Sequence, residues 1–273
     1  NVRTTILTAG DMYWNLVDGK YEIPKGGKKH SMFAGALWVG GVDAGNNLKV
    51  AAMTYRQGGN DFWPGPLNIN DVSVSDEQCT KYDRHFQITR EEVDKFVADG
   101  TVTSNITNWP GNGDASNGET DYLAPFFDKD GDTRYNPAAG DFPMFYRPEY
   151  GSFKKNAFIY GDKSLWWVFN DKGNIHTETG GQQIGLEIHA QAFAFTTNDA
   201  INDMTFYQYH IFNRSTLTLN ETYFGQWMDP DLGNYQDDFV GCDVREGVGY
   251  VFNGDDDDGV IISCVADNNI KDD

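Results

Sequence analysis

An alternating run near residue 190 constrains the fold of this chain more than any other feature of its sequence. In a β-strand, successive side chains point to opposite faces of the sheet. Between Gly185 and Phe195 one such face is apolar throughout and carries Leu186, Ile188, Ala190, Ala192 and Ala194. The opposite face begins with polar side chains and ends with aromatic rings: Glu187, His189, Gln191, Phe193 and Phe195. The run therefore predicts a long strand whose apolar face lies against a core.

Strand-like segments separated by Gly, Asn and Asp turns recur along most of the chain. They are expected at Val2–Thr8, Met32–Val39, Leu48–Arg56, Ser164–Asn170, Gln183–Thr197, Met204–Asn213, Thr218–Met228, Phe239–Val244, Val248–Asn253 and Val260–Val265. One helix is expected at Arg90–Ala98, where Thr89 and Glu92 form a capping box. Its apolar stripe would consist of Val93, Phe96 and Val97. We therefore predict a mainly β fold, an antiparallel β-sandwich or jelly roll with one short helix.

An acidic loop follows residue 127. Asp128, Asp130 and Asp132 stand at alternate positions, and a Gly- and Pro-containing turn then leads to Asn136 and Asp141. Ca²⁺ takes about 6–8 oxygen ligands, which a short turning segment rich in carboxylates and carbonyls can supply. The sequence therefore predicts a calcium site formed by these five side chains and a main-chain carbonyl near Arg134. The alternative is a solvated acidic turn.

The loop departs from the helix-loop-helix calcium pattern. The turn glycine expected at the sixth position is Thr133, and the glutamate expected at the twelfth is Ala139. Pro125 and Pro137 also oppose flanking helices. We therefore expect a structural calcium site in a connecting loop and not a calcium sensor.

A second acidic segment lies between two predicted strands. It contains Asp229, Asp231, Asp237, Asp238 and Asp243 around a Gly-Asn turn, and it is a second candidate calcium site. A third acidic run, residues 255–258, fits a site or a solvated turn equally well, because consecutive acids point in alternating directions.

Composition excludes some classes of function. The 273 residues carry 21 Lys and Arg against 41 Asp and Glu, a formal net charge of −20. Nucleic-acid binding requires Lys and Arg to neutralise phosphates, so no nucleic-acid partner is expected. No apolar run approaches the roughly 20 residues of a transmembrane helix. The 39% hydrophobic content supports a sizeable core.

The chain is expected to divide at its Gly-, Asn- and Pro-rich middle. We predict an N-terminal β segment with a short helix over residues 1–105, a calcium-loop connection over 106–150, and a C-terminal β-sandwich segment over 151–273. The first and last segments can form a single domain. Of the cysteines Cys79, Cys242 and Cys264, the last two flank a predicted hairpin and can pair, although three buried thiols fit equally.

Signals for ligand binding and catalysis are weaker. Trp63 and Trp109 lie in Pro-Gly loops and are the candidate platforms for a sugar ring. Glu187 and His189 share a strand face and could serve acid–base chemistry, but alternation often produces such pairs. The histidines are dispersed and show no zinc-helix spacing. We predict no catalytic residue, and an enzymatic role is not favoured.

Eight segments of the chain resemble the N-terminal region of large secreted surface proteins of Bacteroidota. They are Asn1–Trp14, Phe33–Asp43, Lys49–Arg56, Asn60–Leu67, Asp121–Pro143, Trp166–Gly173, Gly225–Gly233 and Asp238–Asp243. The resemblance implies export by the type IX secretion system, which a C-terminal sorting domain normally directs. No such domain is recognised before Asp273, so a fragment or a processed product is expected. The resemblance supplies no catalytic residue.

These observations lead to one hypothesis and one alternative. We expect an extracellular, calcium-stabilised β module from which an export signal has been removed, acting in adhesion or as a subunit of an extracellular filament. Residues 1–7 could donate a strand to a neighbouring subunit. The alternative is a carbohydrate-binding or polysaccharide-degrading protein that uses Glu187 or an acid of the second segment.

Overall fold

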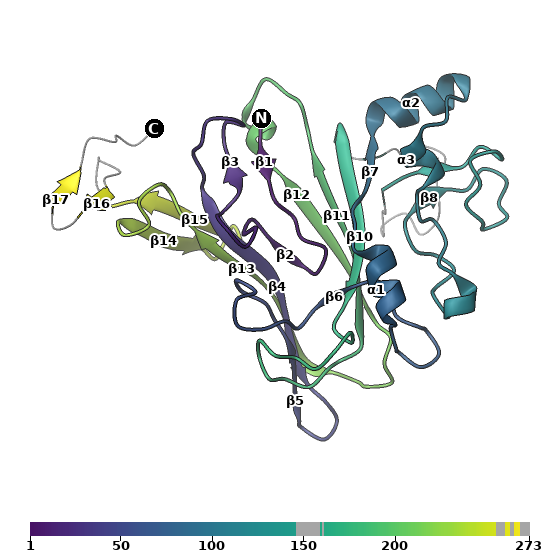
Figure 1. Ribbon diagram of the computed structural model, residues 1–273, viewed down its shortest axis with the longest axis horizontal. Helices are drawn as coiled ribbons and strands as arrows, with labels where there is room; N and C mark the ends of the chain where they lie inside the picture. The colour runs from purple at the N-terminus through teal and green to yellow at the C-terminus, as the bar shows by residue number, and fades with distance from the viewer. Residues whose placement is uncertain (146–158, 160, 255–259, 263–264, 268–273) are drawn as a thin grey trace.

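The computed structural model describes residues 1–145, 159, 161–254, 260–262 and 265–267 (Figure 1). Its helices are α1 (Asp76–Tyr82), α2 (Arg90–Asp99) and α3 (Ser104–Thr107), with short 3-10 helices at Ala115–Asn117 and Ala200–Asp203. Its strands are β1 (Arg3–Thr4), β2 (Asp11–Met12), β3 (Tyr21–Glu22), β4 (Met32–Val42), β5 (Leu48–Ala51), β6 (Trp63–Pro64), β7 (Phe86–Thr89), β8 (Phe126–Phe127), β9 (Phe142–Pro143), β10 (Lys163–Asn170), β11 (Leu186–Ala194), β12 (Phe206–Asn213), β13 (Asn220–Pro230), β14 (Asp238–Asp243), β15 (Val248–Asn253), β16 (Val260–Ile262) and β17 (Val265–Asp267).

Two antiparallel sheets form the body of the molecule. The first has the order β12-β11-β10-β6, and β7 also pairs with β10. The second has the order β13-β4-β2, and β5 also pairs with β4. Each sheet therefore contains strands from both the N-terminal and the C-terminal parts of the chain, because β4 pairs with β13, and β6 and β7 pair with β10. Residues 1–105 and the C-terminal segment are not separate sheets.

The predicted strand near residue 190 is β11, and its apolar face lies in the core between the two sheets. Leu186, Ile188, Ala190 and Ala192 are buried there. They belong to one cluster with Leu37 and Val39 of β4 and with Trp167 and Phe169 of β10. The prediction of a mainly β, sandwich-like fold with antiparallel strands is confirmed.

A second core covers the other face of the β10–β11–β12 sheet, on the side where Figure 1 shows the helices. Alternation along β10 directs Trp166 and Val168 into this core. They meet side chains from the helices and from the chain after residue 105: Val93, Phe96, Ile106, Trp109, Leu123, Phe126 and Phe142. Much of the expected connection at 106–150 is therefore packed against the sheet.

The polar half of β11 is also buried. Glu187, His189 and Gln191 are exposed by 0%, 6% and 2%. Glu187 is balanced by His189, whose Nε2 lies 2.8 Å away, and by Arg214, whose Nη2 lies 2.7 Å away. Burial opposes ionisation of Glu187, but these two partners lower its pKa below the ordinary value. Glu187 is thus held in a buried ion pair with Arg214.

Helix α2 forms where its capping signals predict. The Thr89 hydroxyl accepts a hydrogen bond from the Glu92 backbone amide, and the Glu92 carboxylate accepts one from the Thr89 backbone amide. Gly100 ends the helix at φ 78°. The predicted stripe is partly wrong, because Val97 is 54% exposed. Helices α1 and α3 were not expected from the sequence.

The ends of the described chain differ most from expectation. Only Arg3–Thr4 of the predicted strand Val2–Thr8 is a strand, and it pairs with β3. The terminal amine of Asn1 donates to the carbonyl of Asn202, and Asn1 Nδ2 donates to Asp203. Residues 1–7 are thus engaged within their own molecule, which does not favour strand donation. The predicted strand Val260–Val265 is instead the β16–β17 hairpin, with residues 263 and 264 outside the described part.

The hairpin of β14 and β15 projects from the sandwich on the side opposite the helices (Figure 1). Several of its apolar side chains are exposed: Phe239, Val240, Val248, Tyr250 and Phe252. Within the described residues, no helix has the length and apolar character needed to cross a membrane.

Candidate metal centre

The acidic loop connects two short strands that pair with each other. Phe126 and Phe127 of β8 face Pro143 and Phe142 of β9. Asp128 directly follows the first strand and Asp141 directly precedes the second, so the pairing brings the two ends of the loop together. The apolar residues fix this arrangement, because Phe126 and Phe142 are both buried in the second core.

Three carboxylates gather at the base of the loop. Asp128, Asp130 and Asp141 each offer an oxygen that lies within 4.8 Å of the others, a spacing at which they could hold a metal ion. Asp141 is fully buried, Asp128 is partly buried and Asp130 is exposed. The cluster therefore has a buried floor and a side open to solvent.

Backbone amides orient two of the carboxylates. Asp128 accepts hydrogen bonds from the amides of Gly131 and Thr133, at 2.7 and 2.9 Å. Asp141 accepts from the amides of Lys129 and Asn136, at 2.9 and 2.8 Å. A carboxylate oxygen has two lone pairs, so it can accept an amide and still bind a cation.

The turn reaches this geometry through two left-handed residues, Gly131 at φ 79° and Thr133 at φ 68°. Glycine adopts such angles without strain, whereas a β-branched residue seldom does. Thr133 occupies the position where the calcium pattern has a glycine. Its φ is positive, as the φ of that glycine would be.

Repulsion among the carboxylates is visible at Asp130. The hydrogen bond from the Asp132 amide lowers the pKa of Asp130, but partial desolvation, the charges of Asp132 and Asp141 and the contact with Asp128 outweigh it and raise the pKa above the ordinary value. A cation between the carboxylates would remove this penalty.

The other predicted residues of the loop take different positions. Asp132 does not belong to the group of three, and its carboxylate accepts a hydrogen bond from the amide of Arg134, two residues further on. The side-chain oxygen of Asn136 accepts from the backbone amide of Ala138, while the backbone amide of Asn136 donates to Asp141. Asn136 thus supports the cluster through its backbone.

Asn112 and Tyr135 anchor the loop to the second core, and sequence reasoning missed both. Asn112 accepts from the amide of Tyr135 at 2.6 Å and donates to the carbonyl of Thr133 at 3.0 Å. The hydroxyl of Tyr135 donates to the carbonyl of Ile106 at 2.6 Å. These contacts join segments more than twenty residues apart, so no local sequence pattern predicts them.

The second acidic segment does not form a comparable cluster among the described residues. Asp229 accepts from the hydroxyl of Tyr55 at 2.7 Å, Asp238 from the amide of Leu232, and Asp243 from the amides of Arg245 and Glu246. Asp231 donates its amide to Ser31, and Asp237 donates its amide to Asn234. Most of these contacts are those of turns and strand ends. The third run, residues 255–258, lies outside the described residues.

The two candidate sugar platforms are largely covered. Trp109 is 4% exposed, with its Nε1 donating to the carbonyl of Pro125, so it is a core residue and not a platform. Trp63 is half-buried and its ring stacks on His176, with centroids 6.1 Å apart. Cys79 and Cys242 are free thiols, and Cys264 lies outside the described residues.

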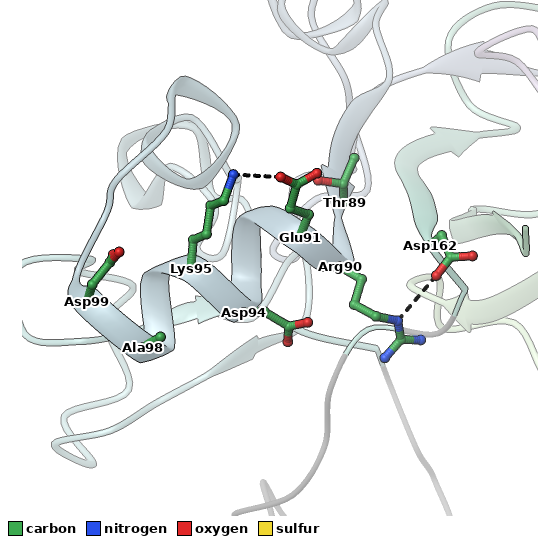
Figure 2. A pocket seen from close by; sticks show the side chains of 8 residues that line it. All are labelled: Thr89, Arg90, Glu91, Asp94, Lys95, Ala98, Asp99 and Asp162. Carbon is green, nitrogen blue, oxygen red and sulfur yellow. Dashed lines mark hydrogen bonds and ion pairs between the residues drawn. The ribbon is translucent and has the colours of Figure 1, made fainter.

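A surface pocket of about 630 Å³ borders α2 (Figure 2). Its charged side chains are largely neutralised by one another, since Arg90 pairs with Asp162 and Lys95 with Glu91. Figure 2 shows the Lys95–Glu91 pair along the helix and Arg90 reaching from the helix to Asp162 on a neighbouring segment, with Asp94 and Asp99 in neither pair. The pocket presents no convergent catalytic set.

The fold and the loop define a class: a mainly β, sandwich-like protein with a carboxylate cluster that could hold a metal ion. Comparison with protein-family models, with curated proteins and with solved structures finds no match for this chain.

Proposed function

We propose that this protein is a calcium-stabilised β module that acts outside the cell, in adhesion or as a subunit of an extracellular assembly. The observation that carries the proposal is the convergence of Asp128, Asp130 and Asp141 at the base of one loop. The resemblance to exported Bacteroidota surface proteins supports the location.

Calcium is the cation that best suits these donors. The cluster offers only oxygen, and three carboxylates can supply up to six ligand atoms, some of them in pairs. Zinc prefers His and Cys ligands in a tetrahedral set, and the cluster contains neither. Magnesium demands near-ideal octahedral geometry, which an open loop with one exposed carboxylate is poorly built to impose.

The role that follows is structural. A cation between Asp128 and Asp141 would tie the end of β8 to the start of β9, and through Phe126 and Phe142 it would stabilise the second core. Calcium is abundant outside cells, so a site of modest affinity would remain occupied there.

The first test is thermal unfolding with calcium and with EDTA. A ligand present at 100 times its Kd adds about 2.7 kcal/mol to the stability of the folded state. For a chain of this size, that corresponds to a rise in Tm of roughly 5–10 °C. Magnesium at the same concentration should produce a smaller rise. Identical melts with calcium and with EDTA would contradict the proposal.

A matched pair of variants tests the ligand assignment. Asp130→Asn removes a charge from the cluster at an exposed position, and Asp132→Asn removes one charge from the same loop outside the cluster. Calorimetric titration should show calcium affinity reduced by at least tenfold in Asp130→Asn and within about threefold of wild type in Asp132→Asn, where only screened long-range charge is lost. Equal losses in both would show that the cluster is not the binding site.

A further inference from the structure

A buried histidine between the two sheets makes a pair of contacts that a neutral imidazole cannot satisfy. The side chain of His176 is fully buried in the loop between β10 and β11. Its Nδ1 lies 2.8 Å from the carbonyl oxygen of Val50 in β5. Its Nε2 lies 2.8 Å from the carbonyl oxygen of Asp171, at the end of β10.

Both partners are carbonyl oxygens, which only accept hydrogen bonds. A neutral imidazole has one N–H donor and one lone pair, so one ring nitrogen would face a carbonyl oxygen lone pair to lone pair. Moving the proton to the other nitrogen leaves the same conflict, and turning the ring over places Cδ2 and Cε1 where the two nitrogens lie. Two good hydrogen bonds require a proton on each nitrogen, which is the imidazolium form.

The surroundings supply the balancing charge. Asp61 Oδ2 lies 3.8 Å from Nδ1 and Asp171 Oδ2 lies 3.6 Å from Nε2, and both carboxylate side chains are fully buried. The further acid in this loop, Glu178, accepts from the hydroxyl of Thr54. The cluster therefore places a cation between two acids.

The two carboxylates are held by donors only. Asp61 accepts from the amides of Ala52, Glu178 and Thr179 and from the hydroxyl of Thr179. Asp171 accepts from the amides of Ile184, Gly185 and Leu186. Burial raises the pKa of Asp171 above its ordinary value, and these amides and the charge of His176 offset only part of that shift. A protonated carboxyl would need an acceptor for its proton.

We propose that His176 is an imidazolium in the folded protein and, as a donor to two carbonyls, fastens the 171–185 loop to β5. A ring with only one N–H would lose one carbonyl contact and leave two buried carboxylates without their cation. The same loop contacts the rest of the molecule through the Thr177 amide to Asn60 and a bridge between Lys49 and Gln182.

The test on the wild-type protein is the NMR spectrum of its ¹⁵N-labelled histidines at pH 7. The two ring nitrogens of His176 should both carry protons and show the chemical shifts of an imidazolium. A neutral tautomer of His176 would overturn the proposal.

Two variants sharpen the test. His176→Gln identifies the resonances and removes the cation, so the amides of Ile184–Leu186, which bond Asp171, should exchange at least tenfold faster than in wild type at the same pH. Unchanged exchange would contradict the proposal. His30→Gln, at an exposed position, serves as control and should leave this exchange unchanged. If His176→Gln does not fold, the spectrum of the wild-type protein still decides.

Discussion

At the scale of single residues, backbone amides decide which acids converge. Alternate spacing correctly pointed to Asp128 and Asp130, and the acid at the far end of the turn, Asp141, joins them. Asp132 fits the same spacing, but its carboxylate bonds the backbone two residues ahead, a local contact that Asp often makes in turns. Sequence spacing cannot separate these outcomes, because it does not reveal which amides are free.

A partly buried histidine away from the loop, His85, gives a prediction about acid stability. The Nε2 of His85 is buried and has no hydrogen-bond partner within the described part of the chain, and the ring lies edge-on to Trp167. Burial lowers the pKa of His85 to about 4. The unfolded chain takes up this proton near pH 6.5, so the contribution to stability is complete above that pH and is lost as pH falls towards 4.

Replacement of His85 by Phe should therefore weaken the acid sensitivity. Between pH 7 and pH 4 the variant should lose less stability than wild type, by at most roughly 3 kcal/mol. Urea unfolding at several pH values measures the difference, and His30→Gln, at an exposed position, should follow wild type. Parallel pH profiles for wild type and His85→Phe would contradict the assignment.

Among the elements, α2 was predicted because its capping residues precede an apolar stripe. Helix α1 was missed because its capping residues do not. Helix α2 has both signals, with Val93 and Phe96 buried. Helix α1 has an equally complete capping box, formed by Ser75 and Gln78, but the residues it buries are Gln78 and Tyr82. The side-chain amide of Gln78 is buried and donates to Glu119. A buried polar residue of this kind does not contribute to the hydrophobic periodicity that predicts a helix.

The capping box of α2 provides a test at this scale. Thr89→Ala removes the acceptor for the Glu92 amide and should lower the free energy of unfolding by about 1 kcal/mol. Chemical denaturation provides the measurement. Thr101→Ala, just past the same helix, removes a hydroxyl that bonds only the side chain of Asp99 at the surface, and it should change stability by less than about 0.5 kcal/mol. Equal effects would show that the cap adds nothing to stability.

At the scale of the whole molecule, the sandwich depends on pairings between distant parts of the chain. Alternation predicted most of the long strands and the apolar face of β11, because period and turn residues are local signals. The pairing of β4 with β13 joins segments about 190 residues apart in sequence. Many alternating strands could match β4 equally well, so the order of strands could not be read from the sequence.

Two truncations test which strands the fold requires. Among the described residues, members of the two cores extend no further along the chain than Trp227. A chain ending at Pro230 should therefore keep a cooperative thermal transition close to that of residues 1–273. A chain ending at Asn213 lacks β13, uncovers the edge of β4, and should lose that transition. Circular dichroism melts distinguish the two, and loss of cooperativity in the longer chain would contradict the assignment of the cores.

The register of β4 and β13 also determines how the molecule would respond to tension. Met32 at the start of β4 faces Pro230 at the end of β13, and Asn220 faces Val42 at the opposite end of the pair. A force applied through the preceding and following parts of the chain would load the Met32 end of both strands. The hydrogen bonds between β4 and β13 would then break one pair at a time, instead of all resisting the force together. The two strands should therefore separate at low force.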